Sequence, residues 1–286
     1  MHIESLTMDR ARKLLPARDP FGHKGTFGKV LLLCGSKGYT GAPWFAAMGA
    51  LRSGTGLVYL GVPESIYDIE AVKLNETVIF PLPEETGTLS EKALPEILKR
   101  LPGMDAVLIG CGLGQSAGTE ALVQAVLQQA ACPVILDADG INVMVKHKDI
   151  LRRRANPTIL TPHYGEFLRI GGIPAENPME AAEKLAGDLN VIVLLKGHET
   201  CVTDGNRGFI NHTGNSGMAK GGSGDLLAGV ILGFLGQGML PLEAAACGAF
   251  FHGAAGDLAA QEFSEYGMIP TDLLTALPRQ IKRDGM

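Results

Sequence analysis

The chain of 286 residues is long enough for one α/β domain with a large core, and its 46% hydrophobic and 19% charged residues exclude a disordered or fibrous protein. A net charge of -5 provides no broad basic surface, so nucleic acid is not an expected partner. Five scattered cysteines without a C-x-x-C spacing exclude a zinc site or a disulfide framework, and they indicate a reducing, cytoplasmic location for a single domain spanning residues 1–286.

The predicted elements alternate between strands and helices along the chain. Residues 1–19 carry several charged side chains and therefore lack the apolar stretch of a secretory signal. After them, short runs of Val, Ile and Leu each end in glycine, proline or a polar turn, and their near-continuous apolar character predicts strands covered on both faces. The predicted strands are Val30–Leu33, Leu57–Leu60, Ala106–Ile109, Val134–Leu136, Thr158–Leu160 and Val191–Leu195.

Helical patterns separate these runs. Ser90 is the expected N-cap of one helix, because a serine side chain can accept a hydrogen bond from a free amide of the first turn. The alternation of strands with helices predicts an α/β fold with a largely parallel central sheet and helices on both faces. The predicted helices are Ala42–Arg52, Ser90–Arg100, Ser116–Gln129, Pro178–Leu189, Asp225–Leu235 and Leu242–Leu258.

Two stretches of the second half have patterns of their own. Residues 204–206, Asp-Gly-Asn between two β-prone segments, predict an antiparallel hairpin appended to the sheet. The apolar stretch Leu242–Ala260 is rich in Gly and Ala but contains three polar side chains, which predicts a buried helix and no membrane span. Within it, Ala244–Ala255 is explained equally well by an interface between copies and by a core helix.

The glycine-rich segment 221–225 carries the strongest functional signal. In open parallel sheets, ligands collect at the carboxyl ends of the strands. Gly221, Gly222, Ser223, Gly224 and Asp225 lead into an apolar helix, and the small residues leave the first amides free to face an anion that the helix dipole favours. A carboxylate there can simply cap the helix, but a cap needs no run of small residues ahead of it. We therefore predict a phosphoryl-binding anion hole with Asp225 as the adjacent base.

This segment resembles the anion-hole and catalytic-aspartate motif of ribokinase-like kinases. Further strings, in matching order, are similar to the ADP-dependent NAD(P)H-hydrate dehydratases of that superfamily. The resemblance spans nearly the whole chain and begins near residue 23, so we expect no room for the N-terminal epimerase domain that some members carry. The strings are His23–Val30, Gly110–Gly114, Leu160–Glu166, Lys196–Thr200 and Gly214–Ala219.

The resemblance implies dehydration of the S-epimer of hydrated NADH or NADPH back to NADH or NADPH, with ADP or ATP as phosphoryl donor and AMP as the product of ADP. The ring hydroxyl would be phosphorylated, and phosphate would then leave with electron donation from the ring nitrogen. Asp225 would be the base, the amides of Gly222, Ser223 and Gly224 would stabilise the phosphoryl group, and Mg²⁺ would neutralise its remaining oxygens. The family also suggests a homo-oligomer, often a tetramer, and a separate NAD(P)H-hydrate epimerase in the same pathway.

The same resemblance assigns individual contacts. Substrate contacts fall on Ala42, Gly112 or Gly114, His163 and Asp225. Nucleotide contacts fall on Lys196, Gly197, His198, Glu199, Thr200 and Gly224. Ala42 follows the glycine-rich loop 35–41, which is flexible enough to close over a ligand, although an ordinary strand-to-helix turn explains this segment equally well.

Structural roles offer an alternative explanation for His163, Glu166 and Lys196. His163 and Glu166 would both face the cleft if a helix begins near Tyr164, but both could equally serve as caps or surface residues. The resemblance suggests that Glu166 helps to hold hydrated Mg²⁺, although His163 stands where the related motif has asparagine. Lys196 could extend to solvent along its apolar stem, or it could enter the cleft to reach a nucleotide phosphate or ribose.

Other functions fit parts of the sequence. Gly112, Gly114 and Ala117 match the dinucleotide-binding fingerprint, and Asp137 lies near the place of a ribose-binding acid, as in an NAD-dependent oxidoreductase. That hypothesis leaves segment 221–225 without a purpose. A kinase of a vitamin or sugar alcohol would use the same anion hole and base, and a nucleotide sensor would keep the fold without turnover.

Overall fold

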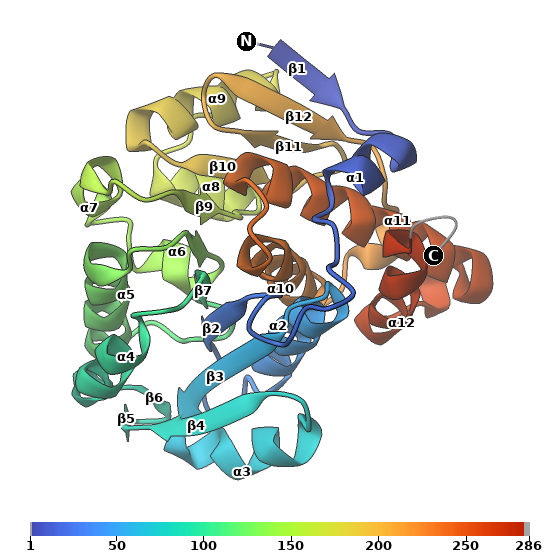
Figure 1. The fold of residues 1–286 in the computed structure, drawn as a ribbon. Coiled ribbons are helices and arrows are strands. Elements are labelled where there is room, and N and C mark those ends of the chain that lie inside the picture. The colour runs from blue at the N-terminus through green and yellow to red at the C-terminus, as the bar shows by residue number, and fades with distance from the viewer. Residues whose placement is uncertain (1, 283–286) are drawn as a thin grey trace.

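The computed structural model describes residues 2–282 and is built around one ten-stranded sheet (Figure 1). Its strand order is β1-β12-β11-β10-β9-β8-β7-β2-β3-β4. Strand β11 runs antiparallel to both of its neighbours, and every other pairing in this sheet is parallel. The strands are β1 (His2–Ser5), β2 (Lys29–Leu33), β3 (Leu57–Pro63), β4 (Val78–Leu82), β7 (Ala106–Ile109), β8 (Val134–Leu136), β9 (Thr158–Leu160), β10 (Ile192–Leu195), β11 (Thr200–Thr203) and β12 (Arg207–Asn211), with β5 (Glu84–Glu85) and β6 (Thr88–Leu89) in a separate small ladder.

Helices cover both faces of the sheet (Figure 1). Successive strand residues face opposite sides, so Val30 and Leu32 of β2 join one hydrophobic cluster while Leu31 and Leu33 join the other. The first cluster includes helices α1 (Met8–Leu14), α2 (Gly41–Arg52), α3 (Glu64–Lys73), α10 (Ser223–Gly236), α11 (Pro241–Gly267) and α12 (Pro270–Ile281). The second includes α4 (Leu94–Arg100), α5 (Ala117–Gln129), α6 (Asp139–Asn142), α7 (Lys148–Arg153), α8 (Tyr164–Ile170) and α9 (Pro178–Leu189). Short 3-10 turns form η1 (Glu91–Ala93) and η2 (Ser216–Met218).

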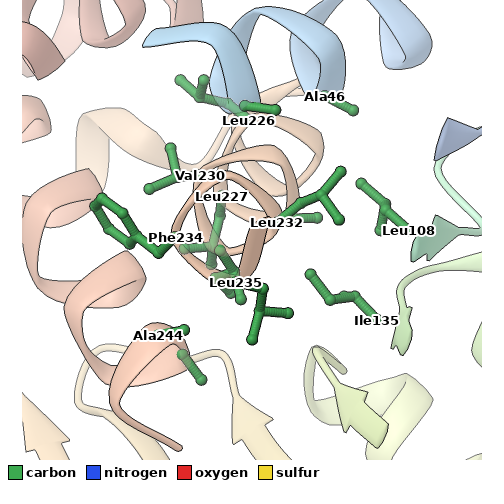
Figure 2. Close-up of a cluster of buried hydrophobic side chains, with 14 of the residues drawn as sticks. Ala46, Leu108, Ile135, Leu226, Leu227, Val230, Leu232, Phe234, Leu235 and Ala244 are labelled. Atoms are coloured by element: carbon green, nitrogen blue, oxygen red, sulfur yellow. The ribbon is translucent and has the colours of Figure 1, made fainter. Parts of the chain in front are cut away.

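Helix α10 lies at the centre of the first cluster (Figure 2). Nearly all of its side chains are buried, because the helix is enclosed by the sheet, α2 and α11. Leu108 of β7, Ile135 of β8, Ala46 of α2 and Ala244 of α11 all belong to this cluster. Burial on all sides explains why the helix is apolar all round. The position of its N-terminus is therefore fixed by the core.

The predicted fold class, strands and hairpin are confirmed, and the strand bounds differ from the prediction by three residues at most. The predicted capping by Ser90 is wrong: its Oγ donates to the carbonyl of Pro83 at 3.3 Å and makes no cap hydrogen bond to η1. The sequence analysis did not predict β1, β4, β5, β6, α1, α3, α6, α7 and α12.

The apolar stretch 244–255 belongs to the core of this chain. Its residues lie within α11 and are buried against α10, the sheet and α12, so the core-helix alternative is the correct one. Helix α11 is longer than predicted and contains a non-helical residue, Ser264, with φ of 60°. Within residues 2–282, no helix is both long and apolar enough to cross a membrane.

Candidate active site

The N-terminus of α10 forms the centre of the candidate site. Gly222 precedes the helix with φ of 100°, a left-handed conformation that favours glycine, and a Cβ there would lie 2.6 Å from the ring of Phe45. Within residues 2–282, the amides of Gly222 and Gly224 have no hydrogen-bond partner, whereas the amide of Ser223 donates to the carbonyl of Lys220 at 3.3 Å. Free amides at the positive end of a helix dipole give this turn the chemistry of an anion site.

Asp225 lies in the first turn of α10 and faces the ends of two strands. Cys111 follows β7 and Asp137 follows β8, and one polar side-chain atom from each lies within 4.8 Å of the Asp225 carboxyl and of the other. Burial, followed by the charge of Asp137, raises the pKa of Asp225 to about 6, against the opposing hydrogen bond from Cys111 and charge of Lys196. A carboxylate with such a pKa is suited to accept a proton from a hydroxyl near neutral pH.

The cluster of Cys111, Asp137 and Asp225 does not have the chemistry of a magnesium site. A hydrogen bond with Cys34, burial and the neighbouring carboxylates raise the pKa of the Cys111 thiol well above its usual range. The thiol therefore stays protonated, and Mg²⁺ prefers oxygen ligands.

Lys196 enters the cleft, so the alternative in which it extends to solvent is wrong. Its Nζ lies 3.0 Å from Oδ1 of Asp137, and a Cβ on Gly224 would lie 3.5 Å from Nζ. Burial lowers the pKa of Lys196, but the charges of Asp137 and Glu166 and the hydrogen bond with Asp137 outweigh this effect and leave it raised. The ammonium is therefore a fixed positive charge beside the anion turn.

A cavity of about 750 Å³ opens beside this turn, a volume within the usual range of small-molecule sites. Its walls come from the start of α10, the segment after β10, the loop before α10 and α11. Glu199 is not among the residues that line it, and its Oε1 instead lies 3.1 Å from Nδ1 of His212. The predicted site residues that line it are His163, Lys196, Gly197, His198, Thr200, Ser223 and Gly224.

Ala42, Gly112, Gly114 and Asp225 lie outside the lining of this cavity. A Cβ on Gly112 would lie 2.9 Å from the Cβ of Ala42, so the turn after β7 meets the start of α2. Gly112 and Gly114 have φ of 60° and 79°, which favours glycine at both positions. The neighbours Ser223 and Gly224 of Asp225 line the large cavity, and its carboxyl lies within 4.8 Å of the thiol of Cys111, the residue before Gly112, so Asp225 is close to both groups of residues.

The hypothesis of a dinucleotide-binding fingerprint is wrong. The amide of Gly114 donates to Oδ2 of Asp139 at 2.9 Å, and Ser116 caps the N-terminus of α5 through a capping box. Asp137 is buried and accepts hydrogen bonds from Lys196 and Thr161. Neither an anion site at this turn nor a free ribose-binding carboxylate is left, and the glycines close a turn.

His163 and Glu166 form a capping box at the start of α8. Nδ1 of His163 accepts from the amide of Gly165 at 3.0 Å, and Oε2 of Glu166 accepts from the amide of His163 at 2.9 Å. The His163 ring is still half-exposed and lines the cavity, while Oε1 of the buried Glu166 lies 3.5 Å from His163 Nε2. Capping and a role at the site are therefore compatible.

The loop before α10 is tied to α11 by residues that the sequence analysis did not single out. Nζ of Lys220 donates to three carbonyl oxygens at the end of α11 and just beyond it, at 2.5 to 3.3 Å. Asp257 accepts from the amide of Gly214 at 2.9 Å and from Nδ2 of Asn215 at 3.0 Å. The kink in α11 brings these carbonyls to Lys220, and no local sequence pattern predicts it.

His252 of α11 also lines the cavity and was predicted only as part of a helix. Its Nε2 and the Oγ of Ser223 are buried and have no hydrogen-bond partner within residues 2–282. Burial lowers the pKa of His252 to about 4, partly offset by a hydrogen bond with the backbone of Ser223. The ring is therefore neutral beside the anion turn.

The fold and this site together define a ribokinase-like protein. The structure is similar to that of a ribokinase-like superfamily protein of Enterococcus faecalis, with a TM-score of 0.85 and 26% identity over 98% of this chain and 95% of that chain. A hydroxyethylthiazole kinase protein from Pyrococcus horikoshii shares the fold at a TM-score of 0.62 and 18% identity, over 96% of this chain and 90% of that chain.

Within this class, the chain belongs to the NAD(P)H-hydrate dehydratase family, whose sequence model matches residues 30–279. It is 36% identical over 291 residues to the ADP-dependent (S)-NAD(P)H-hydrate dehydratase of Bacillus subtilis, covering 99% of each chain. The structure of the ADP/ATP-dependent NAD(P)H-hydrate dehydratase of that organism, co-crystallised with ATP/Mg²⁺, matches with a TM-score of 0.84 and 33% identity over 98% of each chain. The expected family is confirmed.

Other relatives are longer proteins. The bifunctional NAD(P)H-hydrate repair enzyme of Moorella thermoacetica is 43% identical over 280 residues, which cover 96% of this chain and 53% of that protein. The chain thus spans about half the length of the bifunctional relatives that it matches.

Proposed function

We propose that this protein dehydrates the S-epimer of hydrated NADH or NADPH back to NADH or NADPH, with ADP or ATP as phosphoryl donor. The observation that carries the proposal is the Asp225 carboxyl in the first turn of α10: its neighbours Ser223 and Gly224 line a nucleotide-sized cavity, and it lies within 4.8 Å of the Cys111 thiol, next to the contact of Gly112 with Ala42. A kinase-type site needs a base between donor and hydroxyl, and this arrangement supplies one. The family and the Bacillus subtilis relatives support the choice of substrate.

In the proposed reaction, the Asp225 carboxylate accepts the proton of the ring hydroxyl as that oxygen attacks the terminal phosphorus of the nucleotide. When ADP is the donor, AMP is the leaving group, and the hydrate becomes a phosphate ester. The ring nitrogen then donates electrons as the carbon–oxygen bond breaks, and loss of a proton from the adjacent carbon restores the double bond. The free amides of Gly222 and Gly224 and the Lys196 ammonium would stabilise negative charge on the transferring group.

The two sides of Asp225 divide the proposed contacts. The nucleotide would occupy the large cavity against Lys196, Gly197, His198, Thr200 and Gly224, with Glu199 contributing through the backbone of this segment. The hydrated nicotinamide would lie against Ala42 and Gly112 or Gly114, and His163, which lines the large cavity, would contact it from the nucleotide side.

Mg²⁺ is the proposed cofactor, held mainly through nucleotide phosphates and water. Glu166 fits a secondary role, because its Oε1 lies 3.5 Å from His163 Nε2, whereas its Oε2 accepts the capping-box hydrogen bond. When bound, the ion would neutralise phosphate oxygens.

We further propose a homotetramer in the cytoplasm that works with an NAD(P)H-hydrate epimerase. Exposed apolar side chains near the end of α11, Phe263, Tyr266 and Ile269, support self-association, and five buried free cysteines support a reducing compartment. The bifunctional repair relatives support the epimerase partner. Light scattering of the purified chain tests the tetramer.

The function is tested by incubating the protein with chemically hydrated NADH, with and without ADP or ATP and Mg²⁺, and following recovery of the reduced nicotinamide absorbance. We expect recovery only with nucleotide, together with AMP when ADP is supplied. Absence of nucleotide-dependent recovery refutes the dehydratase proposal. Phosphorylation of a vitamin or sugar in a parallel panel would then identify a kinase, and nucleotide binding without any turnover would identify a sensor.

A further inference from the structure

Asp137 is a buried carboxylate that neither the nucleotide contacts nor the substrate contacts include. Its side chain is 2% exposed at the end of β8. Oδ1 accepts from Lys196 Nζ at 3.0 Å and from Thr161 Oγ1 at 2.7 Å, and Oδ2 lies 3.5 Å from Cys111 Sγ. The three partners follow three different strands, so the carboxylate joins the ends of β7, β9 and β10.

The backbone around Asp137 is held in an unfavourable conformation. Ala138, the next residue, has φ of 46° and ψ of -113°, in a region that non-glycine residues rarely adopt. A Cβ on Gly110 would lie 1.9 Å from the Asp137 carbonyl oxygen, and one on Gly140 would lie 2.4 Å from the Ile109 carbonyl oxygen. The turn is thus pressed against the end of β7, which leaves the Asp137 side chain little freedom to move.

The charges that face Asp225 come from several elements. Asp137 and Lys196 act on it through their charges, and the Cys111 thiol, which donates to Oδ2 of Asp137 at 3.5 Å, lies within 4.8 Å of its carboxyl. Behind them, Cys34 after β2 contacts Cys111, Glu166 on α8 acts on Lys196, and His252 on α11 lies beside Ser223 and Lys196. Helix α2, which packs against α10, has Arg52 as its only charged residue, at the end remote from the site.

We propose that Asp137 is a positioning residue for this reaction: it fixes the Lys196 ammonium beside Gly224, and its own negative charge keeps Asp225 basic enough to take the hydroxyl proton. The inference rests on the proposed function and deepens it. Asp137 touches neither donor nor acceptor, and it acts through Lys196 and Asp225. One buried carboxylate thereby serves both halves of the transfer, the anion side and the base side.

The sign of each effect follows from electrostatics. Removing the Asp137 charge takes away a repulsion that raises the pKa of Asp225 and leaves the Lys196 cation unpaired, so the pKa of Asp225 falls. Removing the Lys196 cation takes away an attraction, so the pKa of Asp225 rises. A merely structural role for Asp137 would lower activity without moving the pH at which the base titrates.

The test compares Asp137→Asn with Lys196→Met in pH profiles of kcat/KM. Asp137→Asn keeps the size and an acceptor for Thr161, and its acid limb should move to lower pH by at least about half a unit. Lys196→Met should move the limb to higher pH and raise the KM for nucleotide. Thr161→Val, which removes one hydrogen bond to the same oxygen without a change of charge, should leave the limb where wild type has it. An unmoved limb in Asp137→Asn, or shifts of the same sign in the first two variants, overturns the inference.

A second measurement keeps the inference separate from the proposed function. The carboxyl carbon of Asp225 can be titrated by NMR in protein labelled with carboxyl-¹³C aspartate, with Asp225→Asn identifying its signal. The titration midpoint should fall in Asp137→Asn and rise in Lys196→Met even if wild type fails to dehydrate hydrated NADH. Equal midpoints in folded wild type and both variants refute the inference, whereas shifted midpoints without dehydratase activity refute only the proposed function.

Discussion

Gly229 of α10 lies so close to Ala46 of α2 that a Cβ on the glycine would be 2.1 Å from the Ala46 carbonyl oxygen. Gly49 of α2 approaches α10 just as closely, since a Cβ on it would lie 2.7 Å from the Leu226 carbonyl oxygen. The two helices run in the same direction, which brings the N-terminus of α10 and Ala42 of α2 to one edge of the sheet. The anion turn and the proposed substrate contact are therefore placed together by backbone contact between helices.

Gly229→Ala should destabilise the protein by about 1 to 3 kcal/mol, although alanine favours helices, because the added methyl group would push the helices apart. Urea unfolding followed by circular dichroism measures the change. The matched control is Gly187→Ala in α9, where a Cβ would meet nothing within 4 Å. That variant should be as stable as wild type or more stable by up to about 1 kcal/mol. Equal stability of wild type and Gly229→Ala would show that the helices separate without cost.

The anion turn could be predicted from sequence because its signal is local. Segment 221–225 is contiguous and leads directly into a helix, so the glycines, the helix terminus and the acid are read together. Asp137 and Lys196 are 59 positions apart, and the sequence analysis gave them unrelated roles, a candidate ribose-binding acid and a nucleotide contact. Their pairing depends on the order of β8, β9 and β10 and on side-chain burial, which no local pattern contains.

The elements missed by the sequence analysis have physical reasons as well. Strand β4 contains Pro81 and lies at the edge of the sheet, where a strand needs no continuous apolar run. Helix α3 begins after Pro63 without a side-chain cap, so it offers no start signal. Helix α11 extends beyond the predicted end at Leu258 to Gly267. The sequence analysis missed this part because its last turns are polar and exposed and so lack an apolar pattern.

Asp225→Asn should retain nucleotide binding and lose most turnover, by about 10²- to 10⁴-fold in kcat, because an amide cannot accept the hydroxyl proton. In wild type the acid limb of kcat/KM should fall near pH 6, the pKa to which burial raises Asp225. Calorimetry with ADP measures binding, and recovery of nicotinamide absorbance measures turnover. Unchanged turnover in the folded variant would refute Asp225 as the base.

The same substitution should stabilise the fold at neutral pH. The pKa of Asp225 is raised from 3.8 to about 6. This group therefore contributes stability that is fully present below pH 3.8 and is lost as the pH rises through about 6. Asp225→Asn should therefore gain up to about 3 kcal/mol at pH 8 and little at pH 4. Asp188→Asn, which removes only an exposed pair with Lys184, should change stability by less than about 0.5 kcal/mol. A gain that does not depend on pH would contradict this explanation.

Lys220→Met should loosen the wall of the large cavity. The ammonium holds three carbonyl oxygens near the end of α11, and the partly buried position makes their loss worth about 1 to 2 kcal/mol of stability. Because Lys220 and its loop line the cavity, the Kd for ADP should also rise several-fold. Thermal unfolding and calorimetry check both effects, and Lys184→Met on the exposed face of α9 is the control expected to change neither. An unchanged Kd would show that the loop keeps its position in the cavity wall without Lys220.

His252 should make stability depend on pH in the opposite sense to Asp225. Burial lowers the pKa of His252 from 6.5 to about 4, so between these values the unfolded chain binds more protons than the folded one. The histidine contribution is complete above pH 6.5 and is lost as the pH falls towards 4, by about 3 kcal/mol in total. The contribution of Asp225 to folding stability is lost as the pH rises through nearly the same window, so in wild type the two contributions largely cancel.

Urea unfolding from pH 4.5 to 7.5, a range chosen around these values, separates the two contributions: the free energy of unfolding should fall with pH in His252→Asn and rise with pH in Asp225→Asn. If both variants follow the wild-type slope, neither group carries the proposed linkage.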